Sequence, residues 1–520
     1  MKLIKSDDYK KIICFMAMVC LGIGVILHIV PYFYQRSLAL DEAKMISSVC
    51  TRGFSNLVTS PLDWGQSGPI GYMYILKIFS VILGETKLAF RLWSLISWVA
   101  SAFLLYFMIK KVAAKHWALS FTALYSLVDF YIYYSYEVKP YMSDNFFCLL
   151  VFCFWQQYKK NKLSLGKMIA VYSVIIWFSF SAVFFVGAAM IVLCISLLKD
   201  YLKAHEKKYI KSIGLCSIVL VSFLMNYVFW LSKTSANAGD PAYWELLNFP
   251  LMPTSRADLQ LIKMLLWQFV KFLPNVVSTV FVMSFLGYLI KVIKSGDETD
   301  IYLPFIVSFA LLLLASALGF YPIEDRLVQT PCLFLFIFTA AFFELIEKKM
   351  KDKIVVSWIL FGIMAVCLLL TGKEGAKNLF PQHVYRADGE IEENMKYLQE
   401  HLTEDDVIYV WNKTIPGYNY LTGFAYNYTN YGESYEDGNT IYGQQLVSYL
   451  NEEPFSYASE IDWDAVNEDA DLIKKHDSVY MITSRTQSGL AELIEVLDES
   501  GSIEVVSEHY NTRLYHYIAD

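Results

Sequence analysis

The fold is decided by residues 12–42, which read IICFMAMVCLGIGVILHIVPYFYQRSLALDE. Residues 12–34 are apolar and long enough to cross the hydrocarbon core of a bilayer as one helix. Asp41 and Glu42 follow shortly after, where the chain leaves the bilayer. Paired carboxylates at a membrane surface can supply a general base or hold a metal for chemistry on a lipid-borne substrate. The same pair would also arise in a loop that begins with charge because water begins there.

The composition places the chain among membrane proteins. Of its 520 residues, 56% are hydrophobic, and the mean hydropathy is +0.39, which excludes an ordinary soluble protein. Residues 1–11 are basic, but the apolar run after them is long and has no small-residue cleavage site, so it predicts a retained anchor. The nine cysteines are scattered and predict neither a disulfide framework nor a cysteine metal site. Nothing in the composition indicates a nucleic-acid partner.

Charge divides the chain into two parts. Residues 373–520 carry a net charge of −19, and the remainder carries +12, with its lysines in short loops. Because cytoplasmic loops of membrane proteins are enriched in Lys and Arg, these basic loops are predicted to be cytoplasmic. They lie at the N-terminus and at residues 110–115, 159–167, 199–211, 291–294 and 348–353.

This rule sets the predicted topology. If residues 69–84 and 88–110 both crossed the membrane, Lys110 and Lys111 would lie outside, so 69–84 is predicted to be a helix on the outer surface. Pro69 suits the first turn of that helix. The sequence then predicts about eleven crossings, at 12–34, 88–110, 116–135, 144–158, twice within 167–199, 210–231, from near Pro274, 302–320, 327–346 and 354–371.

An odd number of crossings with a cytoplasmic N-terminus places the C-terminus outside. We therefore predict a polytopic α-helical membrane domain at 1–372, with an outside loop at 35–87, and an extracytoplasmic α/β domain at 373–520. Within the latter, a helix at 390–402, strands at 407–411, 478–483, 503–507 and 513–518, and a helix near 488–499 are predicted. The Tyr-rich stretch 412–460 is interpreted as an irregular loop layer, with a sugar-contacting surface as the alternative.

The predicted topology brings four separated groups of charged residues to the outer face. They are Asp41 and Glu42 with Asp63; Arg91; Glu137, Lys139, Tyr141 and Asp144; and Arg326. A lipid phosphate or phosphosugar needs positive charge, for which Arg offers planar bidentate donors, and an acceptor hydroxyl needs a base. Each residue also has a structural interpretation: Arg91 and Arg326 could anchor helix ends at lipid headgroups, and Glu137 could pair only with Lys139.

Several of these segments together resemble a known family. Asp41-Glu42 after the first span, a helix led by Gly68-Pro69, and Phe90-Arg91-Leu92-Trp93-Ser94 are similar to the polyprenyl-phosphate-sugar-dependent glycosyltransferases of the C superfamily (GT-C fold). Within it, the protein O-mannosyltransferase and aminoarabinose-transferase group is the more similar. Residues 136–144 resemble the second outside loop of bacterial members, and the Arg326 segment resembles the one that carries a late phosphate-binding basic residue. The resemblance covers about residues 10–375.

The resemblance implies a mechanism. A sugar on a polyprenyl phosphate sits with its lipid tail between helices, and a glycan, lipid or protein acceptor attacks the anomeric carbon, usually with inversion. Asp41 would be the base and Glu42 would orient it or the acceptor. Arg326 and Arg91 would stabilise the phosphate, although the family's basic residue at the Arg91 motif can instead pair with the loop-one acid. Glu137, Lys139, Tyr141 and Asp144 would complete the substrate-binding surface.

One motif departs from the family. The chain has Ser67-Gly68-Pro69 where relatives have a His-Pro-Pro entry to the surface helix, which leaves subfamily and acceptor open.

No cofactor is predicted. Some relatives use a divalent metal, and Asp41, Glu137 and Asp144 could hold one, but no His-rich cluster supports it, so the prediction is metal independence.

Two other functions stay open at this point. A transporter or lipid-linked-glycan flippase would explain many helices and would place an ionisable residue near mid-bilayer, for which Asp129 in the third span is the candidate. A non-catalytic envelope assembly or glycan-binding membrane protein would act through the outside domain. The Lys-rich loops and the absence of outside disulfides suit a bacterial plasma membrane. The sequence names neither the sugar nor the acceptor.

Overall fold

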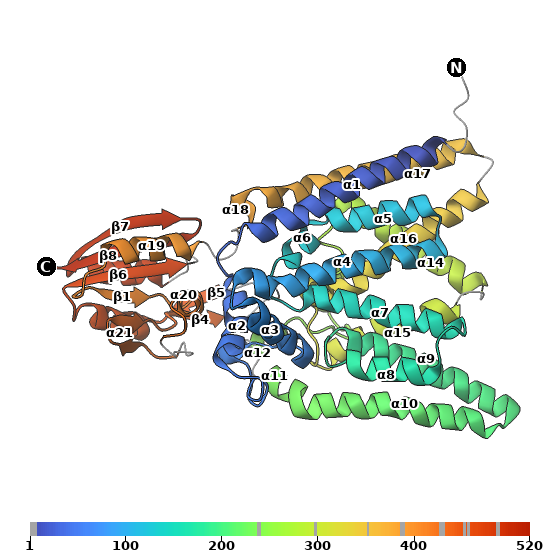
Figure 1. Cartoon of the computed structure of the whole chain (residues 1–520), viewed down its shortest axis with the longest axis horizontal. Coiled ribbons are helices and arrows are strands. Elements are labelled where there is room, and N and C mark those ends of the chain that lie inside the picture. The colour runs from blue at the N-terminus through green and yellow to red at the C-terminus, as the bar shows by residue number, and fades with distance from the viewer. Residues whose placement is uncertain are drawn as a thin grey trace, which may run out of the picture.

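The computed structural model describes residues 8–236, 241–295, 299–350, 353–384, 390–425, 432–450, 454, 458–484 and 489–520. A bundle of long helices occupies one side of the molecule and a smaller sheet domain projects from one end of it (Figure 1). The bundle helices are α1 (Asp8–Phe33), α4 (Lys87–Val112), α5 (Lys115–Leu127), α6 (Asp129–Ser135), α7 (Tyr141–Lys159), α8 (Leu165–Ile175), α9 (Ala182–Ala204), α10 (Lys207–Asn226), α14 (Asn275–Ser295), α15 (Thr299–Ala317), α16 (Asp325–Lys349) and α17 (Ile354–Gly375).

Seven of the described helices are long and apolar enough to cross a membrane: α1, α4, α9, α10 with its π-helical extension η2 (Tyr227–Leu231), α14, α16 and α17. Large apolar side chains point outward from them, such as Leu220 of α10 and Phe229 of η2, which are 56% and 59% exposed. Such exposure is stable in hydrocarbon and costly in water. The predicted class, a polytopic helical membrane protein with a C-terminal α/β domain, is confirmed.

The remaining predicted crossings correspond to shorter or less apolar helices: α7, α8, α15 and the pair α5 and α6. The predicted span 116–135 is divided at Val128 into α5 and α6. Asp129 lies in the first turn of α6, where a carboxylate is favoured by the helix dipole, and it accepts hydrogen bonds from Asn378 and His383. This polar end of a helix is why one continuous span does not form.

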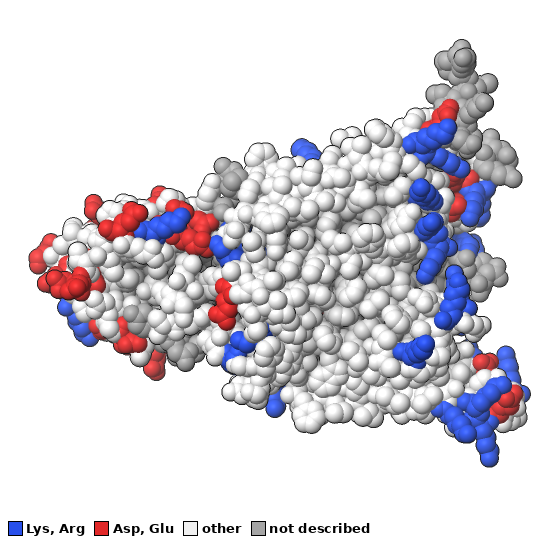
Figure 2. All heavy atoms as spheres, viewed as in Figure 1, with Lys and Arg blue, Asp and Glu red and all other residues white. Residues whose placement is uncertain are grey.

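Basic residues gather at the end of the bundle away from the sheet domain, and acidic residues cover the sheet domain (Figure 2). Lys110 and Lys111 end α4, Lys159 ends α7, and Lys348 and Lys349 end α16, all at that end. The structure thus separates the basic loops from the acidic domain as the predicted topology requires. The assignment of the basic end to the cytoplasm stays a prediction from the positive-inside rule.

The remaining helices outside the C-terminal domain are short, and those labelled in Figure 1 lie toward the end of the bundle that faces the sheet domain. The short helices are α2 (Leu40–Thr51), η1 (Asp63–Gly65), α3 (Ile70–Leu83), α11 (Ser232–Ala236), α12 (Pro241–Glu245), α13 (Arg256–Trp267), η3 (Ala376–Leu379) and α18 (Pro381–Val384). The helix α3 lies where the surface helix 69–84 was predicted. Past the predicted domain boundary at 372, the chain stays with the bundle through η3, because Tyr34 of the first outside segment donates to the Leu379 carbonyl.

The C-terminal domain has three layers. Its six-stranded sheet has the order β2-β3-β1-β6-β8-β7, with β1 parallel to β3 and β6 and the other pairs antiparallel. The strands are β1 (Val407–Val410), β2 (Tyr435–Asp437), β3 (Thr440–Tyr442), β6 (Ser478–Ser484), β7 (Gly501–His509) and β8 (Thr512–Ala519), and a separate hairpin pairs β4 (Val447–Leu450) with β5 (Ala458–Ile461).

Alternate residues of β1 face two different apolar cores. Tyr409 belongs to the core shared with α21 (Trp463–Ile473) and α22 (Leu490–Asp498), whereas Ile408 and Val410 belong to the core shared with α19 (Ile391–His401) and α20 (Ile415–Leu421). This period of two is the pleat of a strand buried on both faces. The expectation of an irregular layer at 412–460 was wrong for its described residues, since α20 and β2–β5 lie there. Elements of three to seven residues carry too little periodicity to be recognised.

Gly375 marks a close approach between α17 and the end of α5. A Cβ atom at Gly375 would lie 2.3 Å from the Leu127 carbonyl oxygen, which is backbone and cannot rotate away. We expect Gly375→Ala to destabilise the protein by about 1–3 kcal/mol, measured as thermal unfolding in detergent. Gly362→Ala in the same helix is the control, because nothing lies within 4 Å of its Cβ position. Equal melting temperatures for the two variants would contradict this packing.

Candidate active site

The helix α2 begins at Leu40, and its first turn carries both acids of the outside loop. The Glu42 carboxylate accepts a hydrogen bond from the Ala39 backbone N–H at 2.9 Å, so the residue at the third helical position closes the N-terminus of its own helix. The helix dipole also favours acids at this end. Adjacent residues of a helix point about 100° apart, so Glu42 can face the interior while Asp41 faces outward.

Glu42 is fully buried and is the acceptor for five donors. Arg91 binds it through Nε at 2.9 Å and Nη2 at 2.8 Å, Arg36 Nη1 lies at 2.7 Å, and the backbone N–H groups of Ala39 and Val138 each lie at 2.9 Å. Burial alone would raise the pKa of Glu42, but the charges of Arg36 and Arg91 and these hydrogen bonds hold it at about 2. Glu42 is therefore a permanent anion that joins four segments of chain.

Arg91 is engaged entirely by this cluster. Besides Glu42, its guanidinium donates to the carbonyl oxygens of Arg36 at 3.1 Å and Ser37 at 3.3 Å, and its side chain is 1% exposed. These contacts are those of a basic residue paired with the loop-one acid. The role of Arg91 as a substrate ligand stays a prediction. In the structure Arg91 holds Glu42 and the segment before α2 in place.

Arg36 was not singled out from the sequence. It is buried beside Glu42, and its guanidinium lies 5.5 Å from the Tyr133 ring and 5.7 Å from the Tyr136 ring. Cation–π contact compensates part of the cost of burying the charge. The sequence does place an arginine six residues before Glu42. Because arginines are common at the membrane interface after a span, this position did not distinguish Arg36.

Asp41 is the exposed member of the acid pair. Its side chain is 39% exposed, and its carboxylate lies 3.4 Å from Arg326 Nη1 and 3.7 Å from Lys139 Nζ. Lys139 also donates to Gln66 Oε1 at 2.7 Å. Three predicted residues from three distant segments thus converge: Asp41 from α2, Lys139 from the segment between α6 and α7, and Arg326 from the first turn of α16.

Arg326 has two further neighbours at this end of α16. Its Nε donates to Glu324 Oε2 at 2.7 Å, and its guanidinium lies 5.9 Å from the ring of Trp244 in α12. Lys271 forms an ion pair with Asp325 at 3.0 Å. Cationic groups held in place by acids therefore gather at the start of α16. Trp244 and Lys271 were not predicted as site residues.

Glu137 precedes Val138, whose backbone N–H binds Glu42, and it is 5% exposed. Its backbone carbonyl accepts from Ser94 Oγ at 2.7 Å, while its carboxylate oxygen Oε2 is buried without a hydrogen bond among the described residues. Burial and the negative charge of Glu42 raise the pKa of Glu137 to about 7. Near neutral pH this carboxyl therefore exchanges between its neutral and charged forms.

Tyr141 and Asp144 stand at the start of α7, and their contacts differ from those of the central group. Tyr141 is buried and packs edge-on against Tyr134 at 4.8 Å between ring centroids. Asp144 accepts hydrogen bonds from Ser179 and Ser181, in the turn between α8 and α9. Its role here is to hold that turn. Asp63 likewise holds its own loop, through Arg52 and Ser48.

A metal fits this donor set poorly. No group of three or more His, Cys, Asp or Glu side chains that could hold an ion occurs among the described residues. Asp144, one of three predicted candidates, is directed to Ser179 and Ser181, and Asp41 contacts two cations. Metal independence itself stays a prediction.

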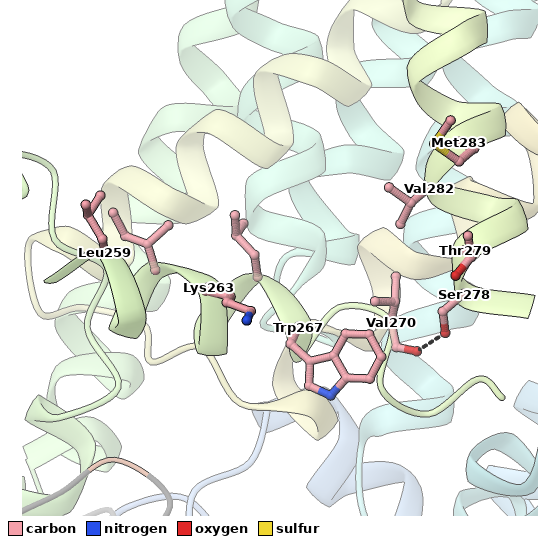
Figure 3. A pocket seen from close by; sticks show the side chains of 10 residues that line it. Leu259, Lys263, Trp267, Val270, Ser278, Thr279, Val282 and Met283 are labelled. Carbon is pink, nitrogen blue, oxygen red and sulfur yellow. Dashed lines mark hydrogen bonds between the residues drawn. The ribbon is translucent and has the colours of Figure 1, made fainter. Parts of the chain in front are cut away.

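An apolar groove of about 560 Å³ lies between α13 and the start of α14 (Figure 3). Leu266, Trp267 and Val282 line it together with the single charged residue Lys263. Val270 of this lining precedes Lys271 in the chain, and Lys271 pairs with Asp325, the neighbour of Arg326.

Comparisons with solved structures agree with this architecture. ArnT from Cupriavidus metallidurans in the apo state is 12% identical, with a TM-score of 0.52 over 96% of this chain and 98% of that chain. The same protein bound to undecaprenyl phosphate is 11% identical, with a TM-score of 0.53 over 98% of each chain. The chain has a GT-C fold. No family model matches the sequence, and no curated protein matches it.

An archaeal oligosaccharyltransferase, AglB from Archaeoglobus fulgidus in complex with an inhibitory peptide and a dolichol-phosphate, is also similar. It is 11% identical over 99% of this chain and 74% of that chain, with a TM-score of 0.47. The fold assignment rests on the two ArnT structures, which confirm the resemblance seen in the sequence at the level of the GT-C fold alone. The roles of individual residues rest on the geometry above.

The two adjacent acids of this GT-C fold should respond differently to neutralisation. Glu42→Gln leaves two buried guanidinium groups without their counter-ion, so we expect a loss of about 3–5 kcal/mol in the free energy of unfolding. Asp41→Asn changes an exposed side chain, and we expect a change within about 0.5 kcal/mol. Thermal unfolding of the purified protein in detergent measures both. A Glu42→Gln variant as stable as Asp41→Asn would contradict the structural role of Glu42.

Glu137 should make stability depend on pH. The folded protein holds the Glu137 proton up to about pH 7, whereas the unfolded chain releases it near its ordinary pKa of 4.5. Between these values the folded state binds more protons, so stability falls as pH rises. We expect Glu137→Gln to lose less thermal stability than wild type between about pH 5 and about pH 8. Glu404→Gln, at an exposed turn, is the control and should follow wild type.

Proposed function

We propose that the protein is a membrane glycosyltransferase that moves a sugar from a polyprenyl-phosphate-linked donor to an acceptor hydroxyl on the outer face of the membrane. The observation that carries the proposal is the exposed carboxylate of Asp41 between the cationic groups of Lys139 and Arg326, at distances of 3.7 and 3.4 Å. A base beside two phosphate-binding cations is what transfer from a phosphate-linked sugar needs.

In this proposal Asp41 is the base. Its contacts with Arg326 and Lys139 are long for ion pairs, and a phosphate entering the site would compete for both cations. Asp41 would then accept the proton of the acceptor hydroxyl while the hydroxyl oxygen forms a bond with the anomeric carbon. The bond between that carbon and the phosphate oxygen breaks, and the phosphate leaves with the electron pair. Arg326 and Lys139 stabilise the charge that develops on it.

Glu42 and Arg91 support this chemistry without taking part in proton transfer. A carboxylate with five donors and a pKa of about 2 is a poor base at neutral pH. Its function in our proposal is to fix α2, so that Asp41 stays directed at the cations. Arg91 supplies the counter-charge that makes this burial stable.

Donor binding is supported by the apolar groove between α13 and α14. Undecaprenyl phosphate is bound in one of the ArnT structures, which share the fold. In this chain the groove offers an apolar surface for a polyprenyl tail, and Lys271, which follows the lining residue Val270 in the chain, pairs with Asp325 beside Arg326. In our proposal the tail lies in this groove and the phosphate is bound by Lys271 and Arg326. The sugar and the acceptor class, whether glycan, lipid or protein, are left to experiment.

The transport alternative loses its best candidate in the structure. Asp129 pairs with His383 at 2.9 Å, and His383 belongs to α18, at the end of the bundle that faces the sheet domain (Figure 1). An ionisable residue at this end is a surface group and not the mid-bilayer site that a carrier would place there.

The decisive experiment is transfer from a panel of radiolabelled polyprenyl-phosphate sugars into membrane material. We expect transfer from one donor, reduced about 10²–10⁴-fold or more in Asp41→Asn. Asp437→Asn, at an exposed position of β2, is the control and should transfer as wild type does. Transfer that survives in a folded Asp41→Asn would keep the reaction and remove the base assignment. No transfer from any donor by folded wild type would reject the glycosyltransferase.

A further inference from the structure

Two aromatic side chains cross between the membrane part and the C-terminal domain in opposite directions. Trp64, in the loop after α2, packs against the core of the C-terminal domain that contains Ile391 and Ile415. Tyr420, from α20 of that domain, packs against the cluster formed by α2 and α3 and donates through its hydroxyl to the Glu85 carbonyl at 3.0 Å. Each part therefore completes an apolar cluster of the other, which a domain resting on the bundle would not do.

The conformation of Trp64 indicates that its insertion is specific. Its backbone has φ 61° and ψ 26°, a left-handed conformation that costs a residue with a side chain about 1 kcal/mol or more. Such a conformation persists only where the surroundings enforce it. Here the enforcing contact is the packing of the indole into the C-terminal domain.

Polar contacts join the same two parts. Ser37 donates to the Glu390 carboxylate, with both side chains buried, and Glu390 itself is fixed by its backbone N–H bond to the Tyr510 carbonyl at 3.1 Å. Lys87, the first residue of α4, pairs with Glu392 at 2.5 Å. Hydrogen bonds and ion pairs sheltered from water are stronger and more directional than exposed ones.

The aromatic and the polar contacts between the two parts are each linked to the proposed active site through a short chain of residues. The Ser37 carbonyl accepts from Arg91 at 3.3 Å, and Arg91 holds Glu42, the neighbour of Asp41. Trp64 stands two residues before Gln66, which accepts from Lys139 at 2.7 Å, and Lys139 contacts Asp41. Glu390 and Trp64 thus reach Asp41 by independent routes.

We propose that the C-terminal domain positions the catalytic site. The domain docks onto the loop at residues 35–87, and this docking fixes α2 and with it Asp41. Ser37, Trp64 and Tyr420 are positioning residues in this inference. The effect of docking on the reaction rests on the proposed function, whereas the effect of docking on α2 does not. A displacement of about 1 Å of a catalytic group can cost about 10²-fold in rate, so a loosened α2 lowers turnover without removing the donor site.

The test uses the purified full-length protein in detergent, with amide hydrogen exchange of α2 (Leu40–Thr51) and transfer kinetics as readouts. We expect Trp64→Ala and Tyr420→Ala to speed exchange in α2 about tenfold or more and to lower kcat about 10–100-fold, with KM for the donor within about threefold of wild type. Trp463→Ala and Tyr435→Ala are matched controls, because these side chains are 51% and 46% exposed, and both should behave as wild type.

A second pair of variants covers the case in which the alanine variants do not fold. Ser37→Ala removes the hydroxyl that donates to Glu390 and leaves the Ser37 carbonyl bond to Arg91 in place. We expect faster exchange at the start of α2 in Ser37→Ala and in Glu390→Ala, and no further increase in the double variant, because one contact is removed in all three.

The outcomes separate this inference from the proposed function. Exchange in α2 reports on docking even if no donor is transferred, so an inactive wild type rejects the glycosyltransferase and leaves the docking result readable. Wild-type exchange in α2 across all the folded interface variants would overturn the inference. A lower kcat with unchanged exchange in α2 would also overturn it, since the domain would then act on substrate and not on the position of Asp41.

Discussion

The buried carboxylate of Glu42 is the constraint on which the end of the bundle that faces the sheet domain depends. An anion removed from water must be matched by charge and hydrogen bonds, and Glu42 obtains both from Arg36, Arg91 and two backbone N–H groups. The donors come from the segment after the first span, from α4 and from the loop before α7. Because none of them can move away without leaving a charge unpaired, these segments have one mutual arrangement. Glu137 adds a second buried carboxyl, which lies near Glu42 and Arg36.

That arrangement separates the functions of two neighbouring acids. Glu42 faces inward and stays ionised, while Asp41, one residue earlier in the same helical turn, faces Arg326 and Lys139 with its side chain partly in water. Two carboxylates made different by their surroundings are a recurrent way to divide support from proton transfer. The proposed base thus owes its position to the burial of its neighbour.

The C-terminal domain belongs to the same system of constraints. Its α19–α20 layer faces α2, and the exchange of Trp64 and Tyr420 across the boundary couples two apolar clusters that neither part completes alone. On the opposite layer, α21 and α22 pack into a core whose described members all belong to the domain itself. A domain with one inward layer and one outward layer has a defined orientation on the bundle, and that orientation is what brings Glu390 to Ser37.

The class of the protein, the order of its long helices and the candidates for its site follow from the amino-acid sequence alone. Apolar runs and basic loops are local properties, readable without knowledge of neighbours, and so is an acid pair that follows a span. Only the tertiary structure decided which acid is buried, that Arg36 and not only Arg91 neutralises it, and that Asp144 serves a turn. The short elements within 412–460 were also decided there. These features depend on contacts between segments far apart in the chain, and no local pattern records the energy of such contacts.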